Sequence, residues 1–253
     1  KMSQTILKLE PIGLHFNTEN PFLFCANHQD LYPKGDENYG LAREALEGRN
    51  VGNDFSIKDG WSMYHGLDVP GFPVHPHRGF ETVSVVKEGF VDHSDSNGAA
   101  GRYGNGDVQW MTAGSGLQHA EMFPLLNKDK ENPVHLLQIW LNLPKKDKFT
   151  QPHFKMLWAE DIPVIEEVND GNKTSITLVA GKYKGTKAVE PAPASWAHEE
   201  KNHVNIWVIS MEANAIFKIP KVNNTITRNL YVYQGQSLYI NHHKVEAFNR
   251  FKL

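Results

Sequence analysis

Short apolar runs, rather than long helical periodicities, make up most of this chain. The first runs cover residues 6–9 and 21–24, and later runs cover residues 62–66, 80–87, 89–93, 107–111 and 135–143. Gly, Asn, Asp and Pro separate the later runs, notably at Glu88-Gly89 and Asn105-Gly106. Short strands with turn residues between them are typical of an antiparallel sandwich or barrel, so we predict an all-β fold.

A second set of apolar runs follows a charged, proline-containing stretch. Residues 144–175 predict a solvated connector, and strand-like runs resume at residues 174–180, 204–211, 215–220, 227–233 and 236–241. We therefore expect two β domains, residues 2–144 and 145–253. The chain stops soon after a hairpin-like turn, which is early for a closed second barrel, so the second domain is expected to be incomplete.

The segment between the first strands and Trp61 differs in composition from the strand-like runs. Polar, Pro and Gly residues from Asn27 to Asn38 predict a loop. Good helix formers with apolar residues at helical spacing then predict one short helix near residues 41–47, which Gly48 would end.

Charge and composition exclude several classes of partner. The formal net charge is -3, and no helix-turn-helix, zinc-finger or basic-arm pattern is present, which argues against direct nucleic-acid binding. No apolar run is long enough to span a bilayer, and no signal peptide is evident. The single cysteine, Cys25, excludes an intramolecular disulfide and fits a reducing compartment. We expect a cytoplasmic protein without a membrane partner.

Two pairs of potential metal ligands stand at i, i+2 spacing: His75 with His77, and His119 with Glu121. Side chains two apart on a strand share a face, so neighbouring strands would direct three imidazoles and one carboxylate into one site. This donor set suits a divalent transition metal and leaves coordination positions open for substrate and dioxygen or water. The alternative is chance, because a chain with 13 histidines can contain an unrelated His-x-His pair.

The context of these pairs resembles the cupin superfamily. Gly71, His75-x-His77, Glu81 and Gly89 resemble the first cupin motif, and residues 106–119 resemble the second in a looser form. The departures from the general pattern are those of pirins. Segments 75–83, 106–114, 119–122 and 137–143 resemble pirin signatures almost residue for residue. The chain is thus similar to the pirin family over residues 59–144, and more loosely beyond them.

The resemblance implies a bicupin, two double-stranded β-helix barrels with metal only in the first. By motif position, His75, His77, His119 and Glu121 correspond to the family's iron ligands. It also implies Fe(II) as the metal, with Mn, Ni, Cu, Co and Zn as alternatives. Some pirin-like proteins are quercetin 2,3-dioxygenases that use O₂ to cleave phenolic, flavonol-type substrates, whereas others are described as transcriptional co-regulators. Two departures are a longer segment at residues 27–60 and the absence of the usual C-terminal segment.

Three functions follow as alternatives. The first is a metal-dependent dioxygenase in which Glu121 acts as the catalytic base for an enolic hydroxyl. The second is a redox-sensing regulatory protein that acts through a protein partner, and the third is a purely structural metal site, which open positions disfavour. Glu81, placed by strand alternation on the face of His77, would either accept a hydrogen bond from an imidazole or bond to backbone or Arg78. His93 would either approach the cavity mouth or serve as a hydrogen-bonded turn residue.

Overall fold

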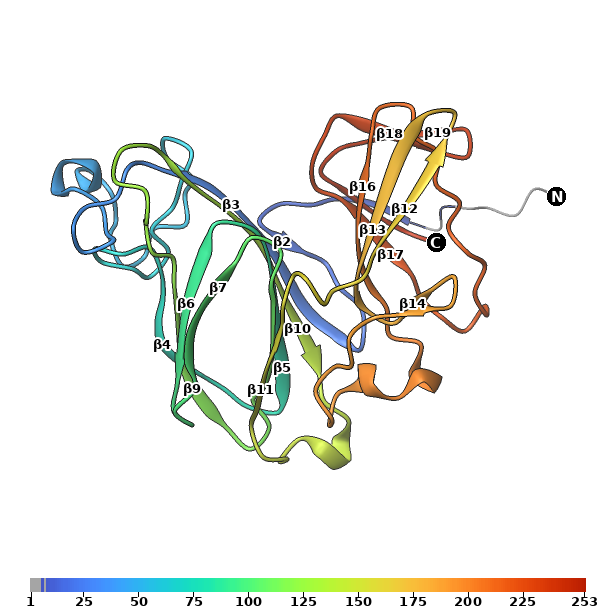
Figure 1. Ribbon diagram of the computed structural model, residues 1–253, viewed down its shortest axis with the longest axis horizontal. Helices are drawn as coiled ribbons and strands as arrows, with labels where there is room; N and C mark the ends of the chain where they lie inside the picture. The colour runs from blue at the N-terminus through green and yellow to red at the C-terminus, as the bar shows by residue number, and fades with distance from the viewer. Residues whose placement is uncertain (1–5, 7) are drawn as a thin grey trace.

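The computed structural model describes residue 6 and residues 8–253, and these residues fold almost entirely as antiparallel strands (Figure 1). The strands of the first half are β1 (Lys8–Pro11), β2 (His15–Phe16), β3 (Phe22–Tyr32), β4 (Gly71–His77), β5 (Phe80–Glu88), β6 (Phe90–Asp95), β7 (Ala100–Gly104), β8 (Val108–Thr112), β9 (Leu117–Met122), β10 (Asn132–Asn142) and β11 (His153–Leu157). Those of the second half are β12 (Val164–Asn169), β13 (Asn172–Ala180), β14 (Lys182–Tyr183), β15 (Thr186–Lys187), β16 (Ile206–Met211), β17 (Asn229–Val232), β18 (Ser237–Ile240), β19 (His243–Glu246) and β20 (Asn249–Lys252). The all-β prediction is confirmed.

Helical structure is limited to four single 3-10 turns in the described part of the chain. These are η1 (Arg43–Leu46), η2 (Lys145–Asp147), η3 (Trp196–His198) and η4 (Glu200–Asn202). The first lies within the range predicted for the short helix. None of them is long and apolar enough to cross a membrane.

Two facing sheets build the N-terminal half. One has six strands in the order β11-β8-β5-β10-β3-β2, and the other has four in the order β4-β9-β6-β7. Side chains from both sheets line one cavity between them, with Ser84 and Gln138 on the first sheet facing His75 and Glu121 on the second. Strand alternation therefore turns one face of β5 and β10 toward this cavity.

The six-stranded sheet is buried on both faces. Its other face packs against the C-terminal strands in one apolar cluster, in which Val83 and Trp110 join Val179 and Ile206. All five residues of β8 are buried, as expected for a strand covered on both sides. The sheet that forms one wall of the cavity is therefore covered on its other face by apolar core and not by solvent.

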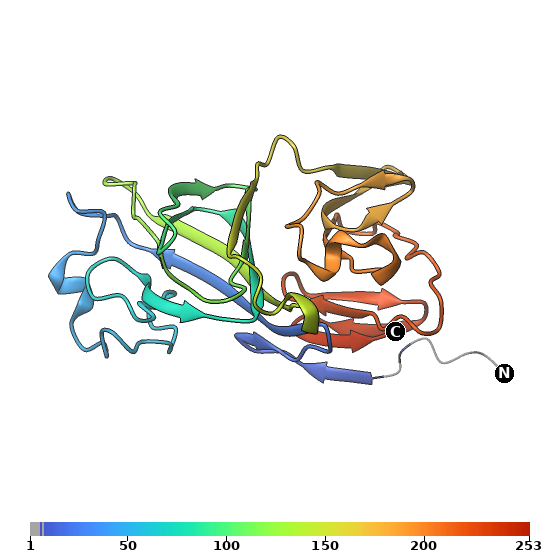
Figure 2. The ribbon, with the colours of Figure 1, turned by 90° about the horizontal axis from the view of Figure 1, so that it is seen from below.

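The C-terminal half contains two three-stranded sheets, β12-β13-β16 and β1-β20-β17, and two hairpins. Two strands cross the predicted division between residues 144 and 145. Figure 2 shows β1, from the N-terminus, beside the C-terminal strands, and β11 adds to the six-stranded sheet through β8. The division of the chain into domains 2–144 and 145–253 stays a prediction.

Some local predictions were wrong. The predicted loop from Asn27 begins as strand, because β3 runs to Tyr32 and buries alternate side chains that include His28 and Asp30. The predicted connector at 144–175 contains β11 and β12. Residues 62–66 make isolated bridges instead of a strand, and residues 215–220 are not in a strand.

Candidate functional site

Strands β4 and β9 bring the two ligand pairs together. They pair antiparallel with His75 opposite His119 and Phe72 opposite Glu121, and an irregularity lies between Phe72 and His75. Gly71 begins β4 at φ +130, and a Cβ there would stand 2.5 Å from the backbone oxygen of Glu121. Only glycine permits this close approach, so the Gly of the motif fixes the strand contact beneath the site.

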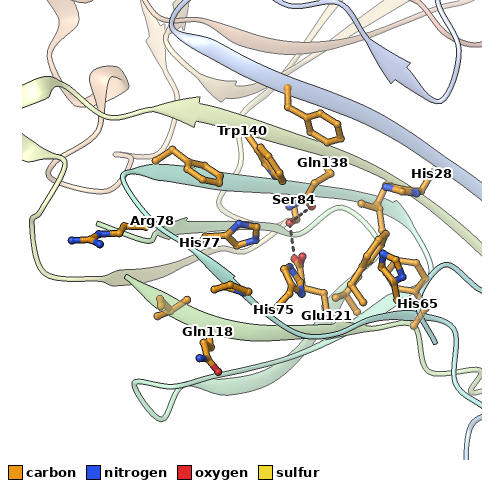
Figure 3. Close-up of a pocket in the computed structure, with 18 of the residues that line it drawn as sticks. His28, His65, His75, His77, Arg78, Ser84, Gln118, Glu121, Gln138 and Trp140 are labelled. Atoms are coloured by element: carbon orange, nitrogen blue, oxygen red, sulfur yellow. Dashed lines mark hydrogen bonds between the residues drawn. The ribbon is translucent and has the colours of Figure 1, made fainter. Parts of the chain in front are cut away.

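Three imidazoles converge at this contact, and Figure 3 shows two of them, His75 and His77. One ligand atom from each of His75, His77 and His119 lies within 4.8 Å of the others. The Nε2 atoms of His119 and His75 are 3.0 Å apart. His75 Nδ1 lies 2.8 Å from the backbone oxygen of Pro73, to which it donates a hydrogen, so its Nε2 keeps the lone pair that faces the cluster.

Burial keeps His77 and His119 uncharged. Desolvation, reinforced by the neighbouring imidazoles, lowers the pKa of His77 to about 4 and that of His119 to about 3. A neutral imidazole is the form that binds a metal ion. His77 and His119 are therefore in their ligating form at neutral pH.

Glu121 flanks the three imidazoles. Its Oε2 lies 3.7 Å from His119 Nε2, while its Oε1 accepts a hydrogen bond of 3.1 Å from the Ser84 hydroxyl. Ser84 Oγ also lies 2.7 Å from Oε1 of Gln138. Ser84 thus holds one carboxylate oxygen of Glu121, and the dashed lines in Figure 3 mark its contacts with Glu121 and Gln138.

The chemistry of this donor set fits a divalent transition metal. Imidazole nitrogens suit Fe, Ni, Cu and Zn, and an adjacent carboxylate adds negative charge that favours harder ions. Two lone-pair nitrogens 3.0 Å apart repel each other unless a cation or a proton lies between them. Three protein nitrogens with one nearby oxygen would leave positions of a six-coordinate ion free for other ligands.

A cavity of about 940 Å³ opens beside the cluster, a size suited to a small organic molecule. Aromatic rings form much of its wall. Trp140 lies 4.6 Å from Phe24, 4.8 Å from Phe80 and 5.4 Å from His77, measured between ring centroids. Phe72 covers the other side, 6.3 Å from His75.

Glu81 does not face the histidines, so the prediction that it shares the face of His77 was wrong. Strand β4 ends at His77, and Gly79 at φ +78 turns the chain before β5 begins, which breaks the alternation. Glu81 instead points to the opposite face of the six-stranded sheet and accepts a 2.8 Å hydrogen bond from Thr112. Burial raises its pKa to about 7, against the smaller opposing effects of Ser195, Thr112 and Trp110.

His93 lies neither at a cavity mouth nor in a turn. It is buried on β6, its Nε2 is 2.9 Å from Asp95 Oδ2, and its ring centroid is 5.5 Å from that of His119. Backbone N–H groups of Asn97 and Ala99 also donate to Asp95. A buried histidine–carboxylate pair thus backs one of the three imidazoles.

Several cavity residues escaped the sequence reasoning. Ser84 and Gln138 had a usable signal, since each is a polar residue inside an apolar strand. Asp95, the partner of His93 behind the cavity wall, had one as well, because the two residues have the same i, i+2 spacing as the ligand pairs. His28 had none, because its segment read as a loop.

Comparisons with known proteins relate part of the chain to pirins. The family model described as Pirin matches residues 41–141. A Pseudomonas aeruginosa protein named "Putative quercetin 2,3-dioxygenase" is 42% identical over 113 residues, which are 45% of this chain and 39% of that protein. Rat pirin is 43% identical over 159 residues, which are 58% of this chain and 52% of that protein.

One solved structure extends the likeness to the whole fold. Quercetin 2,3-dioxygenase from Acinetobacter baumannii superposes with a TM-score of 0.62 at 21% identity, covering 98% of this chain and 78% of that chain. At this identity the likeness shows the fold, and the bicupin prediction is confirmed. The aligned segments span about half, or less, of the length of the two curated relatives.

Proposed function

We propose that the chain is a pirin-type cupin, because the family model described as Pirin matches residues 41–141, and that it is a metal-dependent dioxygenase of flavonol-type substrates. His75, His77 and His119 would hold one divalent ion, with Fe(II) favoured, and Glu121 would be the fourth ligand. The observation that carries the proposal is the convergence of three imidazoles, within 4.8 Å of one another, at an aromatic-walled cavity of about 940 Å³.

The aromatic wall supports a planar phenolic substrate. Trp140, Phe80 and Phe72 present rings on both sides of the histidines, and stacked or edge-on rings at 4.5 to 7 Å attract one another. The same rings exclude water, which strengthens each electrostatic contact inside the cavity. When bound, the metal supplies Lewis acidity for an enolic oxygen and a place for dioxygen.

Glu121 is the group placed to accept the proton of that enolic hydroxyl. Its Oε1 is held by Ser84, whereas its Oε2 lies 3.7 Å from His119 Nε2. A carboxylate oxygen beside the binding position of the substrate can take the proton as the hydroxyl becomes an anion. Ser84 keeps the carboxylate from turning away, so we assign it a positioning role.

The test is oxygen uptake by iron-loaded protein supplied with quercetin, with carbon monoxide release measured in parallel. Glu121→Gln should lower turnover by roughly 10²- to 10⁴-fold, the range for loss of a general base, while quercetin binding changes little. Glu131→Gln, an exposed carboxylate change, is the matched control.

Two results would count against this function. If Glu121→Gln loses metal as completely as His75→Ala does, Glu121 is only a ligand. If fully metal-loaded protein consumes no oxygen with quercetin or with other enediol-like compounds, the regulatory alternative replaces the enzymatic one.

A further inference from the structure

Two amide side chains line the cavity in the described part of the chain, and their settings differ. Gln118 is exposed on β9, whereas Gln138 is half-buried on β10. Strand β10 lies inside the six-stranded sheet, between β5 and β3, and both neighbours of Gln138 along the strand, Leu137 and Ile139, are buried. The exposed part of Gln138 therefore faces the cavity, and Figure 3 shows its side chain beside Ser84.

Ser84 holds one end of this amide, and the other end has no partner. The single hydroxyl hydrogen of Ser84 lies between two acceptors, Oε1 of Gln138 at 2.7 Å and Oε1 of Glu121 at 3.1 Å from Oγ. The Gln138 Nε2 makes no hydrogen bond to any described residue. It is also not among the polar atoms that are sealed from solvent without a partner, so it keeps accessible surface on the cavity side.

An amide nitrogen donates hydrogen bonds and accepts none, so Gln138 offers two N–H hydrogens to a molecule that enters the cavity. Bulk water satisfies them before a ligand enters. An apolar ligand would displace that water and leave the N–H groups unpaired, which costs binding free energy. A ligand with an acceptor oxygen at this point replaces the bond to water, so the site discriminates against an analogue that lacks the oxygen.

The shared Ser84 hydroxyl determines where that acceptor oxygen must lie. Because Gln138 and Glu121 bond to the same Oγ, the amide oxygen lies within two hydrogen-bond lengths of the carboxylate, and Nε2 belongs to the same planar group. A ligand that brings one oxygen to Glu121 can therefore bring a second oxygen to Nε2 from a nearby atom. Trp140, two residues along β10 on the same face, is 5.4 Å from the His77 ring, which favours a flat aromatic carrier for both oxygens.

We propose that Gln138 contacts the substrate directly, with its Nε2 donating a hydrogen bond to a carbonyl oxygen beside the acidic hydroxyl. The ligands selected are thus aromatic compounds with a carbonyl on the carbon next to the enolic one, rather than simple phenols. A flavonol has this pair of oxygens. The contact rests on the proposed function in one respect, the enolic end at the three histidines, and adds to it a basis for selection among phenolic substrates.

The test measures anaerobic binding of three ligands by quenching of tryptophan fluorescence, in zinc-loaded protein and again after removal of metal. Flavone has the carbonyl without the enolic hydroxyl, flavan has neither, and 3-hydroxyflavone has both. Wild type should bind flavone about tenfold more tightly than flavan, with or without metal. Gln138→Met, of similar length but without a donor, should weaken binding of flavone and 3-hydroxyflavone about tenfold. The same variant should bind flavan as wild type does, or more tightly.

Metal content and stability separate this contact from a structural role. Because Nε2 makes no hydrogen bond in the fold and Ser84 keeps Glu121 as an acceptor, Gln138→Met should retain the metal and the melting temperature of wild type. Gln29→Met, an exposed change on β3, is the control.

A Gln138→Met variant that loses metal but keeps the preference for flavone would assign Gln138 to holding Glu121 and overturn the proposal. Equal weakening of flavone and flavan, or a wild type without the preference, would also overturn it. Selective loss of flavone binding in metal-free protein supports it, even if the iron-loaded protein consumes no oxygen and the dioxygenase proposal fails.

Discussion

The two faces of strand β5 carry buried polar residues into two different environments. Ser84 points into the cavity, where its hydroxyl bonds to Glu121. Glu81 points the other way, into the core between the six-stranded sheet and the C-terminal strands, where Val83 and Val85 also lie. The side chains of Ser84 and Glu81 are both buried, so burial alone does not distinguish the two faces.

The side chains around Glu121 and around Glu81 distinguish the two faces. Around Glu121 three imidazoles converge beside a cavity that can hold a ligand. Around Glu81 only neutral groups are found, the Thr112 hydroxyl among them, and its Oε2 has no hydrogen-bond partner in the described part of the chain. A buried carboxylate is functional where its neighbours offer further chemistry, and otherwise it affects stability.

Glu81→Gln should give the largest effect on stability and none on metal content. The pKa of Glu81 is about 7 in the folded state against a usual 4.5, so between these values the folded state retains a proton that the unfolded state has released. Stability therefore falls as pH rises from about 4.5 to 7, by about 3 kcal/mol for this group. Glu81→Gln should remove that slope in urea unfolding measured across this pH range.

The contrast between the two faces of β5 is contradicted if Glu81→Gln keeps the wild-type dependence of stability on pH, or if it is less stable than wild type at pH 8. A loss of metal in Glu81→Gln would show that the two faces are not independent.

Asp95→Asn should give a smaller effect, which is a loss of metal affinity at the histidine cluster. Although burial acts against it, hydrogen bonds from His93, Asn97 and Ala99 hold the pKa of Asp95 below its usual range, so it is an anionic partner for His93 behind His119. Asp95 is bonded to His93 and not to a metal ligand itself, so its loss should weaken metal affinity by about tenfold, the low end of the range for a group that is hydrogen-bonded to a ligand. Chelator competition would measure this change.

Asp92→Asn is the matched control, because Asp92 lies on the same strand but makes a surface ion pair with Arg102. Equal affinities for Asp95→Asn and Asp92→Asn would show that the buried pair does not support the site.

Sequence reasoning found the ligand pairs because both lie within single strands, where the period of two holds. The same reasoning misplaced Glu81, because a turn at Gly79 separates it from His77 and alternation does not continue through a turn. Motif spacing thus predicts side-chain direction within a strand but not across its end.

The other cavity residues are brought together by pairing between strands that lie far apart in the sequence. His28 reaches it because β3 pairs with β10, which places His28 opposite Leu136, more than a hundred residues later. Tyr103 reaches it through β7, at the edge of the four-stranded sheet. Neither register follows from local sequence, since only tertiary contacts select among the possible strand pairings.

Metal analysis tests the central claim most directly. Protein purified without chelator or nickel resin should contain about one divalent transition metal per chain, as expected for a single cluster of three imidazoles in the described residues. His77→Ala should lose that metal, whereas His203→Ala, in the C-terminal half, should retain it. A folded wild type without metal, or a His77→Ala variant that retains its metal, would contradict the account.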